Sequence, residues 1–99
     1  MEVRITARHG NISQNEETWI RAKLDRLSRF FQDSRPAQVV VEHASDRSAV
    51  EMSIGAPRGV QLSAHAEATS LRAAVIAAES KLETQLRKVK ERITHRRGV

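Results

Sequence analysis

Apolar residues recur every three or four positions between Leu71 and Ile93, which is the spacing of side chains on one face of an α-helix. The side chain of Thr69 or Ser70 can cap the start of such a helix. A helix of roughly 25 residues, at about 1.5 Å per residue, is longer than a small sheet can cover. We therefore expect its C-terminal end to project beyond the core. The apolar stripe comprises Leu71, Val75, Ala78, Leu82, Leu86, Val89 and Ile93.

The same segment carries the net charge of the molecule. The chain has a formal net charge of +5, and residues 81–99 alone contain seven Lys or Arg residues against two Glu residues. Charge concentrated in this way produces a one-sided positive field, which attracts polyanions. The alternative is an ordinary solvated helix face, because Lys and Arg are common on exposed helices.

The first third of the chain predicts a strand followed by a helix. Residues 3–7 alternate between apolar and polar, which is the pattern of a strand with one buried face. Ser13 and Glu16 have the spacing of a capping box, and apolar residues at helical spacing follow, so we predict a helix over residues 14–31. Pro36 prevents its continuation, because proline lacks a backbone donor and disfavours helical geometry in the residue before it. The expected buried stripe is Ile20, Leu24, Leu27 and Phe31, widened by Trp19 and Phe30.

Three strand-like runs come next, over residues 37–44, 50–54 and 60–67. Turn-forming residues at 45–48 and 55–59 separate them, so we expect an antiparallel meander. The order β-α-β-β-β-α predicts an α+β fold in which a four-stranded mixed sheet has both helices packed on one face, as in double-stranded-RNA-binding domains. A right-handed crossover through the first helix places the first strand parallel to a later one, most simply the second.

The composition fits one small domain. The chain has 99 residues, and 39% of them are hydrophobic, which is enough for one core. We expect a single domain over residues 1–99, ordered through residue 94 and frayed over residues 95–99. The sequence has no cysteine, which excludes disulfides and thiolate metal sites. It shows neither a signal peptide nor an apolar stretch of membrane-spanning length, so we expect a cytoplasmic protein that binds no membrane.

Motifs for catalysis, metal binding and cofactor binding are absent from the sequence. The four histidines lack the spacing that aims two imidazoles at one metal from a helix; they are His9, His43, His65 and His95. A nucleophile elbow, a phosphate-binding loop and a dinucleotide fingerprint are also missing. We therefore expect no enzymatic activity, no cofactor, no metal site and no small-molecule substrate.

Nucleic-acid binding through charge and shape is favoured instead. The predicted strands lack the aromatic residues of an RNA-recognition motif, and the chain lacks the G-x-x-G loop of a KH domain. Lys23 and Arg26 lie one turn apart on the first helix, and they could meet the basic residues of the last helix if the two helices pack side by side. Such a surface fits a phosphate backbone. Arg8 and His9 are either a further RNA contact or an exposed strand end. The basic residues of the last helix are Lys81, Arg87, Lys88, Lys90 and Arg92.

The sequence also resembles a known family, the ribosome hibernation promoting factors, which are also called ribosome-associated inhibitor A or sigma-54 modulation proteins. The resemblance covers nearly the whole chain, through VRITARH, AKLDRLSRFF, GVQLSAHAEA and, most specifically, KLETQLRKVKER. It implies binding to the small ribosomal subunit in the mRNA and tRNA channel, and storage of ribosomes in an inactive state in starved or stationary-phase cells. The residues that match the family's basic, rRNA-contacting positions are Lys23, Arg26, Lys81, Arg87, Lys88, Lys90 and Arg92.

Several positions depart from the family's pattern. Glu16 and Glu79 stand where relatives often have apolar residues, and a carboxylate is costly there if it is fully buried. Thr84 replaces a frequent basic residue, and Arg72 lies in a stretch that is commonly Asp-Met-Tyr-like. The sequence stops after its last helix, as short members of the family do, and a short member is expected not to pair ribosomes unaided. A piece of a longer member would end in the same way.

Two other functions remain open at this stage. One is general binding of double-stranded RNA, because the expected fold is also that of double-stranded-RNA-binding domains. The other is a protein-interaction module, in which the last helix pairs with a partner helix through Leu82, Leu86, Val89 and Ile93. We expect the free protein to be a monomer.

Overall fold

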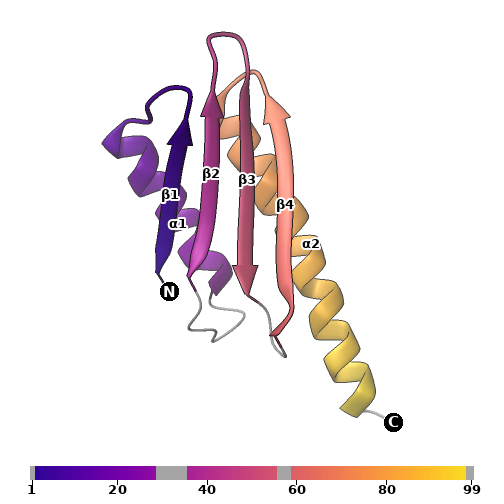
Figure 1. The fold of residues 1–99 in the computed structure, drawn as a ribbon. Coiled ribbons are helices and arrows are strands. Elements are labelled where there is room, and N and C mark those ends of the chain that lie inside the picture. The colour runs from indigo at the N-terminus through magenta and orange to yellow at the C-terminus, as the bar shows by residue number, and fades with distance from the viewer. Residues whose placement is uncertain (1, 29–35, 56–58, 98–99) are drawn as a thin grey trace.

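The computed structural model describes residues 2–28, 36–55 and 59–97. Its elements follow the predicted order β-α-β-β-β-α, which is therefore confirmed (Figure 1). They are β1 (Val3–Arg8), α1 (Gln14–Ser28), β2 (Ala37–His43), β3 (Ser48–Gly55), β4 (Gln61–Ala68) and α2 (Leu71–Arg97). The last three predicted residues of the first helix, 29–31, lie outside the described residues.

The four strands form one mixed sheet in the order β1-β2-β3-β4. β1 runs parallel to β2, with Val3 opposite Ala37, and the other neighbours are antiparallel. Met52 lies at the centre, opposite Val39 on one side and Ala64 on the other. Both the predicted meander and the parallel pairing of the first two strands are thus confirmed.

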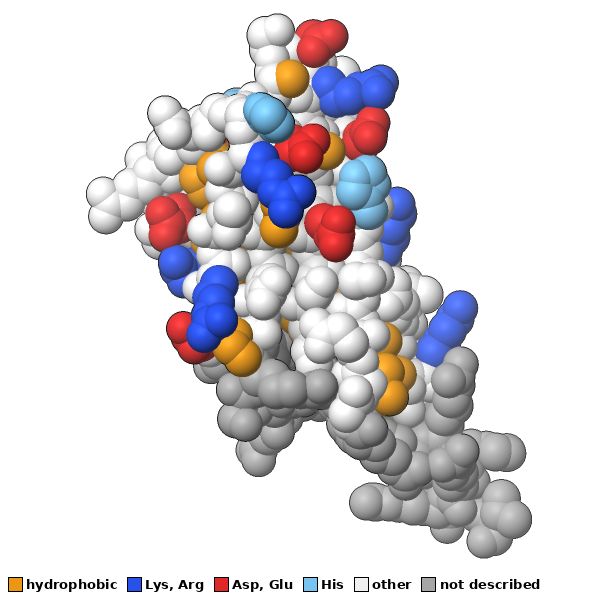
Figure 2. All heavy atoms as spheres, in the orientation of Figure 1, with side chains coloured by type: hydrophobic (Ala, Val, Ile, Leu, Met, Phe, Trp, Pro, Cys, Tyr) orange, Lys and Arg blue, Asp and Glu red, His pale blue; other side chains and the backbone are white. Residues whose placement is uncertain are grey.

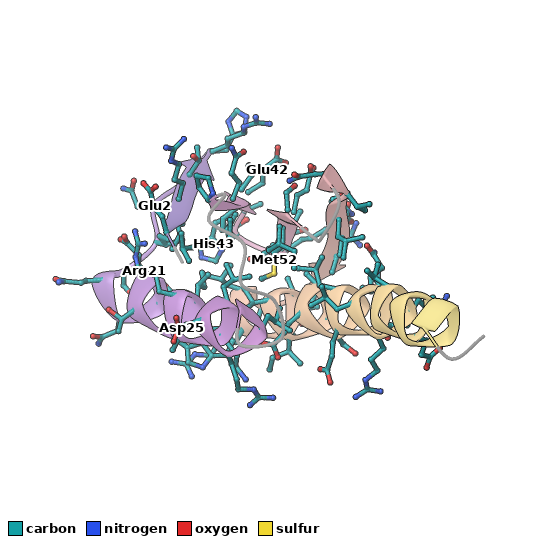
Figure 3. The ribbon with its side chains drawn as sticks, turned by 90° about the horizontal axis from the view of Figure 1, so that it is seen from below. Glu2, Arg21, Asp25, Glu42, His43 and Met52 are labelled. Carbon is teal, nitrogen blue, oxygen red and sulfur yellow. The ribbon has the colours of Figure 1, made fainter. Side chains whose placement is uncertain are left out.

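Both helices cover the same face of the sheet, and the core lies between the two layers. Figure 3 shows α1 and α2 as one layer beneath the sheet, with Met52 between the layers. The predicted apolar stripes of the two helices form the helical side of the core. Their buried residues are Ile20, Leu24 and Leu27 of α1 and Leu71, Val75, Ala78, Leu82 and Leu86 of α2. Trp19 and Val89 are half-buried against the same core. Phe30, Phe31 and the side chain of Ile93 fall outside the described residues.

Side-chain caps begin both helices. The Glu16 backbone N–H donates to Ser13 Oγ at 3.1 Å, and the Ser13 N–H donates to Glu16 Oε1 at 2.9 Å, which is the predicted capping box. At α2 the Ala73 N–H donates to Ser70 Oγ at 3.2 Å, so Ser70 provides the cap. These bonds satisfy amides that have no partner inside the helix.

The last helix is the longest element of the molecule, with 27 residues. Its C-terminal part projects past the end of the sheet, as predicted (Figure 1), and the molecule measures 52 × 22 × 18 Å. Fraying of residues 95–99 stays a prediction. Neither helix contains, within its described residues, an apolar stretch long enough to cross a membrane.

Candidate nucleic-acid interface

The outward surfaces of α1 and α2 together form one side of the molecule, which we call the helical face. α1 packs on β1 and α2, whereas α2 packs on β3 and β4. Lys23 and Arg72 lie at the adjoining sides of the two helices, because both contact the Trp19 ring. Arg26 is exposed, and helical spacing places it on the same side of α1 as Trp19, seven residues earlier. The Asp25 side chain points away from the sheet (Figure 3). The structure thus brings Lys23 to α2, with Arg26 on the same side of α1.

Trp19 links the two helices at the helical face. Lys23 Nζ, one turn further along α1, lies 5.4 Å from the centroid of the Trp19 ring. The guanidinium carbon of Arg72, at the start of α2, lies 5.0 Å from the same centroid. Both distances fall within the range of cation–π attraction. One indole therefore holds a cation from each helix.

Arg72 is a basic residue of this surface that sequence reasoning did not assign to it. It occupies the first turn of α2, where a positive charge is opposed by the helix dipole. Its position beside Trp19 depends on packing between two helices that are far apart in the sequence. The sequence shows only that a cation lies at the end of the helix where the dipole disfavours it. It does not show which residue that cation contacts.

Glu16 lies at the rim of the helical face, half-buried. The pKa of its carboxyl is below the ordinary value of 4.5, chiefly because it accepts a hydrogen bond from the Ser13 backbone N–H. Burial acts in the opposite direction, while the Ser13 hydroxyl and the positive charges of His43 and Arg72 lower the pKa further. This departure from the family pattern is accommodated as an ionised, capped carboxylate.

Glu79 is accommodated differently. Only 7% of its surface is exposed, and its Oε2 atom has no hydrogen-bond partner in the described structure. An unpaired polar atom in such a position destabilises the fold. Of the two unusual carboxylates, therefore, Glu16 reaches the rim and Glu79 is buried.

Lys81 lies on the side of α2 that faces away from α1. Its Nζ donates a hydrogen bond to the His65 carbonyl oxygen at 2.7 Å, and Gln85 Nε2 donates to the Ser63 carbonyl oxygen at 2.8 Å. Both acceptors belong to β4, which is an edge strand. Lys88, two turns after Lys81, is exposed on the same side of α2. The structure therefore separates Lys81 and Lys88 from Lys23 instead of joining them.

The remaining predicted residues have varied surroundings. Arg87 is exposed and forms an ion pair with Glu83 at 2.7 Å. Lys90 and Arg92 belong to α2, but their side chains lie outside the described residues. His9 has a φ of 55°, a left-handed conformation that directly follows the end of β1.

Arg8 lies on the outer face of the sheet, opposite the helical face. With Val40, Glu42 and His65 it lines a shallow hollow. Figure 2 shows acidic, basic and histidine side chains intermingled on this face. The outer face of the sheet is therefore mixed in charge, and Arg8 is remote from the other predicted residues.

The arginines differ in whether a carboxylate neutralises them. Arg4, Arg21, Arg47 and Arg87 form ion pairs with Glu2, Glu17, Glu67 and Glu83, respectively. Within residues 2–28, 36–55 and 59–89, Lys23, Arg26, Arg72 and Lys88 form no ion pair. Both helices therefore present unneutralised positive charge. Over the described residues, no three His, Asp or Glu side chains are placed to hold a metal ion.

Fold and surface together define a class: two-layer α+β domains in which a mixed four-stranded sheet carries two helices on one face, with cationic residues on the helices. The N-terminal domain of Protein Y from Thermus thermophilus has a similar fold, with a TM-score of 0.80 and 27% identity over 90% of this chain and 99% of that domain. A ribosomal subunit interface protein from Coxiella burnetii shares the fold, with a TM-score of 0.77 and 24% identity over 92% of this chain and 99% of that structure.

Residues 3–94 match the model of the family described as sigma 54 modulation protein / S30EA ribosomal protein. A ribosome hibernation promoting factor from Pseudomonas putida is 30% identical over 92 residues, which cover 93% of this chain and 89% of that protein. The chain belongs to this family, and the resemblance noted in the sequence is confirmed.

Proposed function

We propose that this protein binds the small ribosomal subunit in the mRNA and tRNA channel and keeps the ribosome inactive. Family membership and the P. putida hibernation factor support a ribosomal target. The observation that carries the proposal is the unneutralised positive charge of Lys23, Arg26 and Arg72 at the adjoining sides of two rigid helices. Contacts from such a face to phosphates give affinity and orientation without reading base sequence.

The proposed rRNA contacts include residues on more than one side of the molecule. A channel surrounds what it binds, so Lys88 on the far side of α2 and Arg8 on the outer face of the sheet contact different walls. Lys81 also stays in this set, because an ammonium has three donors and the His65 carbonyl takes one of them. The further proposed contacts are Arg87, Lys90 and Arg92.

In this proposal inhibition results from occupancy and involves no catalytic step. The bound protein excludes mRNA and tRNA from the channel while cells are starved or in stationary phase, and it acts in the cytoplasm. One small domain with cationic surfaces supplies what occupancy needs, namely volume and attraction to phosphate.

The alternative of helix pairing depends partly on residues that a partner cannot reach. Leu82 is fully buried and Leu86 is 3% exposed, so both belong to the core and cannot insert into a partner helix. General binding of double-stranded RNA needs only the cationic face. It is distinguished from the ribosomal function by comparing the affinities for small subunits and for an arbitrary RNA duplex.

Cosedimentation with purified small subunits at low salt tests the proposal, together with inhibition of cell-free translation. We expect the protein to bind, and mRNA and initiator tRNA to reduce this binding by competition. If about five phosphates are neutralised, a plot of log binding constant against log salt concentration should have a slope of roughly −3.5 to −4.5. Equal affinity for an arbitrary RNA duplex would support the general RNA-binding function instead. A failure to cosediment at low salt would exclude the ribosomal function.

Lys88→Gln is the sharpest single variant for the role of α2. Lys88 is exposed and without an ion pair in the described structure, whereas changing Lys81 also removes its bond to β4. Arg47→Gln is the matched control, because it removes the same charge from the β2–β3 connection. We expect Lys88→Gln to weaken subunit binding several-fold, about the effect of one phosphate contact, and Arg47→Gln to leave it unchanged.

A further inference from the structure

We propose that Lys23 and Arg72 form a clamp for one backbone phosphate of the bound RNA, and that Trp19 holds the clamp in place. The inference rests on the proposed function and adds to it a phosphate site that spans both helices. Arg72 has no counterpart among the basic positions that the family resemblance assigns.

The geometry of the clamp follows from the shared ring. Because each cation lies about 5 Å from the same centroid, their charges are within about 10 Å of each other. Both side chains are long, and in the proposed clamp the planar donor fork of Arg72 and the flexible ammonium of Lys23 turn toward one phosphate. Each cation comes from a different helix, which fixes the phosphate relative to the whole layer of helices.

The positive charges beside Trp19 repel each other, and a bound anion reduces this repulsion. Two cations near one ring repel each other, and Arg72 additionally opposes the dipole of α2. Glu16 is near, but it accepts its hydrogen bond from Ser13 and forms no ion pair with Arg72 in the described structure. A phosphate that enters between the cations relieves both repulsions.

Side chains, and not the helix amides, provide the donors. The N–H groups of Ala73 and Ala74 at the start of α2 already donate to Ser70 Oγ and to the Ser70 carbonyl oxygen. These two amides are therefore unavailable to a phosphate, and the proposed clamp relies on the side chains of Arg72 and Lys23. Their removal should abolish the site even though the helix terminus remains.

Trp19 is a positioning residue in this arrangement. Its ring restrains two long side chains that otherwise sample many rotamers, so less conformational entropy is lost when the phosphate binds. The indole is half-buried against the core and need not touch the RNA. In the proposed clamp, its contribution to affinity acts through Lys23 and Arg72.

The test is a mutant cycle measured as equilibrium binding to purified small subunits over a range of salt concentrations. We expect Arg72→Gln to weaken binding about tenfold at low salt and to reduce the magnitude of the log-log salt slope by about 0.7 to 0.9. Trp19→Leu should weaken binding by about threefold in the native background but by less than about twofold when Lys23→Gln and Arg72→Gln are present. Trp19→Phe, which keeps a weaker aromatic face, should fall between native protein and Trp19→Leu.

Two controls make each outcome decisive. Arg47→Gln removes an equal charge, so an effect of Arg72→Gln no larger than that of Arg47→Gln overturns the clamp while the proposed function stands. A Trp19→Leu effect that persists without both cations overturns the positioning role. Urea unfolding identifies any variant that fails to fold, and the Arg72→Gln arm does not depend on Trp19. If the native protein does not bind subunits, the proposed function fails, and the clamp fails with it.

Discussion

At the scale of single residues, the two unusual carboxylates show what a local pattern can and cannot reveal. The capping box of Ser13 and Glu16 could be predicted, because both partners are three residues apart and the pairing is local. The periodicity of α2 alone does not show that Glu79 is buried, because the exposed flank of a helix stripe and its buried flank differ only through what packs against them. The contact of Arg72 with Trp19 could not be predicted either, because it also depends on packing between different elements.

Replacement of Glu79 by leucine should stabilise the protein. The substitution removes a buried oxygen without a partner in the described structure and keeps a similar volume, so we expect the free energy of unfolding to rise by about 1 to 3 kcal/mol. Urea denaturation measures the change. Glu91→Leu, an exposed carboxylate on the same helix, is the control and should have little effect. A loss of stability in Glu79→Leu would mean that the carboxylate has a stabilising role.

Glu16 should make the stability of the fold depend on pH in the acid range. Because its pKa is lowered in the folded state, ionised Glu16 stabilises the protein above the ordinary value of 4.5, and this contribution disappears as the pH falls through the folded-state pKa. Glu16→Gln keeps the shape of the capping box but cannot ionise. We therefore expect native protein to be more stable than Glu16→Gln at neutral pH and the difference to shrink as the pH falls below 4.5, as measured by urea midpoints. A difference independent of pH would contradict this account.

At the scale of elements, each helix covers one free edge of the sheet with its own side chains. Arg21 of α1 donates to the Val3 carbonyl oxygen of β1, while Lys81 and Gln85 of α2 donate to β4. Exposed strand edges promote pairing between molecules, and these bonds occupy part of both edges. The elements and their pairing could be predicted from periodicity and the crossover rule. Which side of α2 faces β4 could not be, because Lys81 and Lys88 occupy equivalent helical positions and yet have different surroundings.

Loss of the two bonds from α2 to β4 should destabilise the sheet edge. We expect Lys81→Met combined with Gln85→Met to lower the free energy of unfolding by about 1 to 2 kcal/mol and to increase self-association, since the carbonyls of Ser63 and His65 become available. Urea denaturation and sedimentation velocity report the two effects. Lys88→Met loses the same charge without a bond to β4, so equal behaviour of the two proteins would contradict a role at the edge.

At the scale of the whole molecule, the two faces differ in how their charge is arranged. The outer face of the sheet mixes acidic and basic side chains. Its Arg4 and Arg47 have carboxylate partners, whereas Arg8 forms no ion pair within the described residues. The helical face carries cations that are unpaired in the described structure. The net charge of +5 does not reveal this difference, because a sum over the sequence contains no information about faces.

Charge removal from the two faces should have unequal effects on binding. Lys23→Gln with Arg26→Gln and Arg4→Gln with Arg47→Gln each remove two positive charges from exposed or half-exposed sites. We expect the first pair to weaken binding to small subunits at least tenfold and to reduce the salt slope by about 1.4 to 1.8, and the second pair to change neither. Equal losses would mean that affinity depends on net charge and not on the helical face.

The order of elements along the chain has a consequence for synthesis. α2 is the last element, and it supplies Leu71, Val75, Ala78, Leu82 and Leu86 to the core. A nascent chain that stops before α2 leaves the inner side of β3 and β4 uncovered and cannot bury its apolar residues. Folding is therefore completed only when α2 has been synthesised, and the helical face forms at that same moment. An unfinished chain has neither the closed core nor the cationic surface.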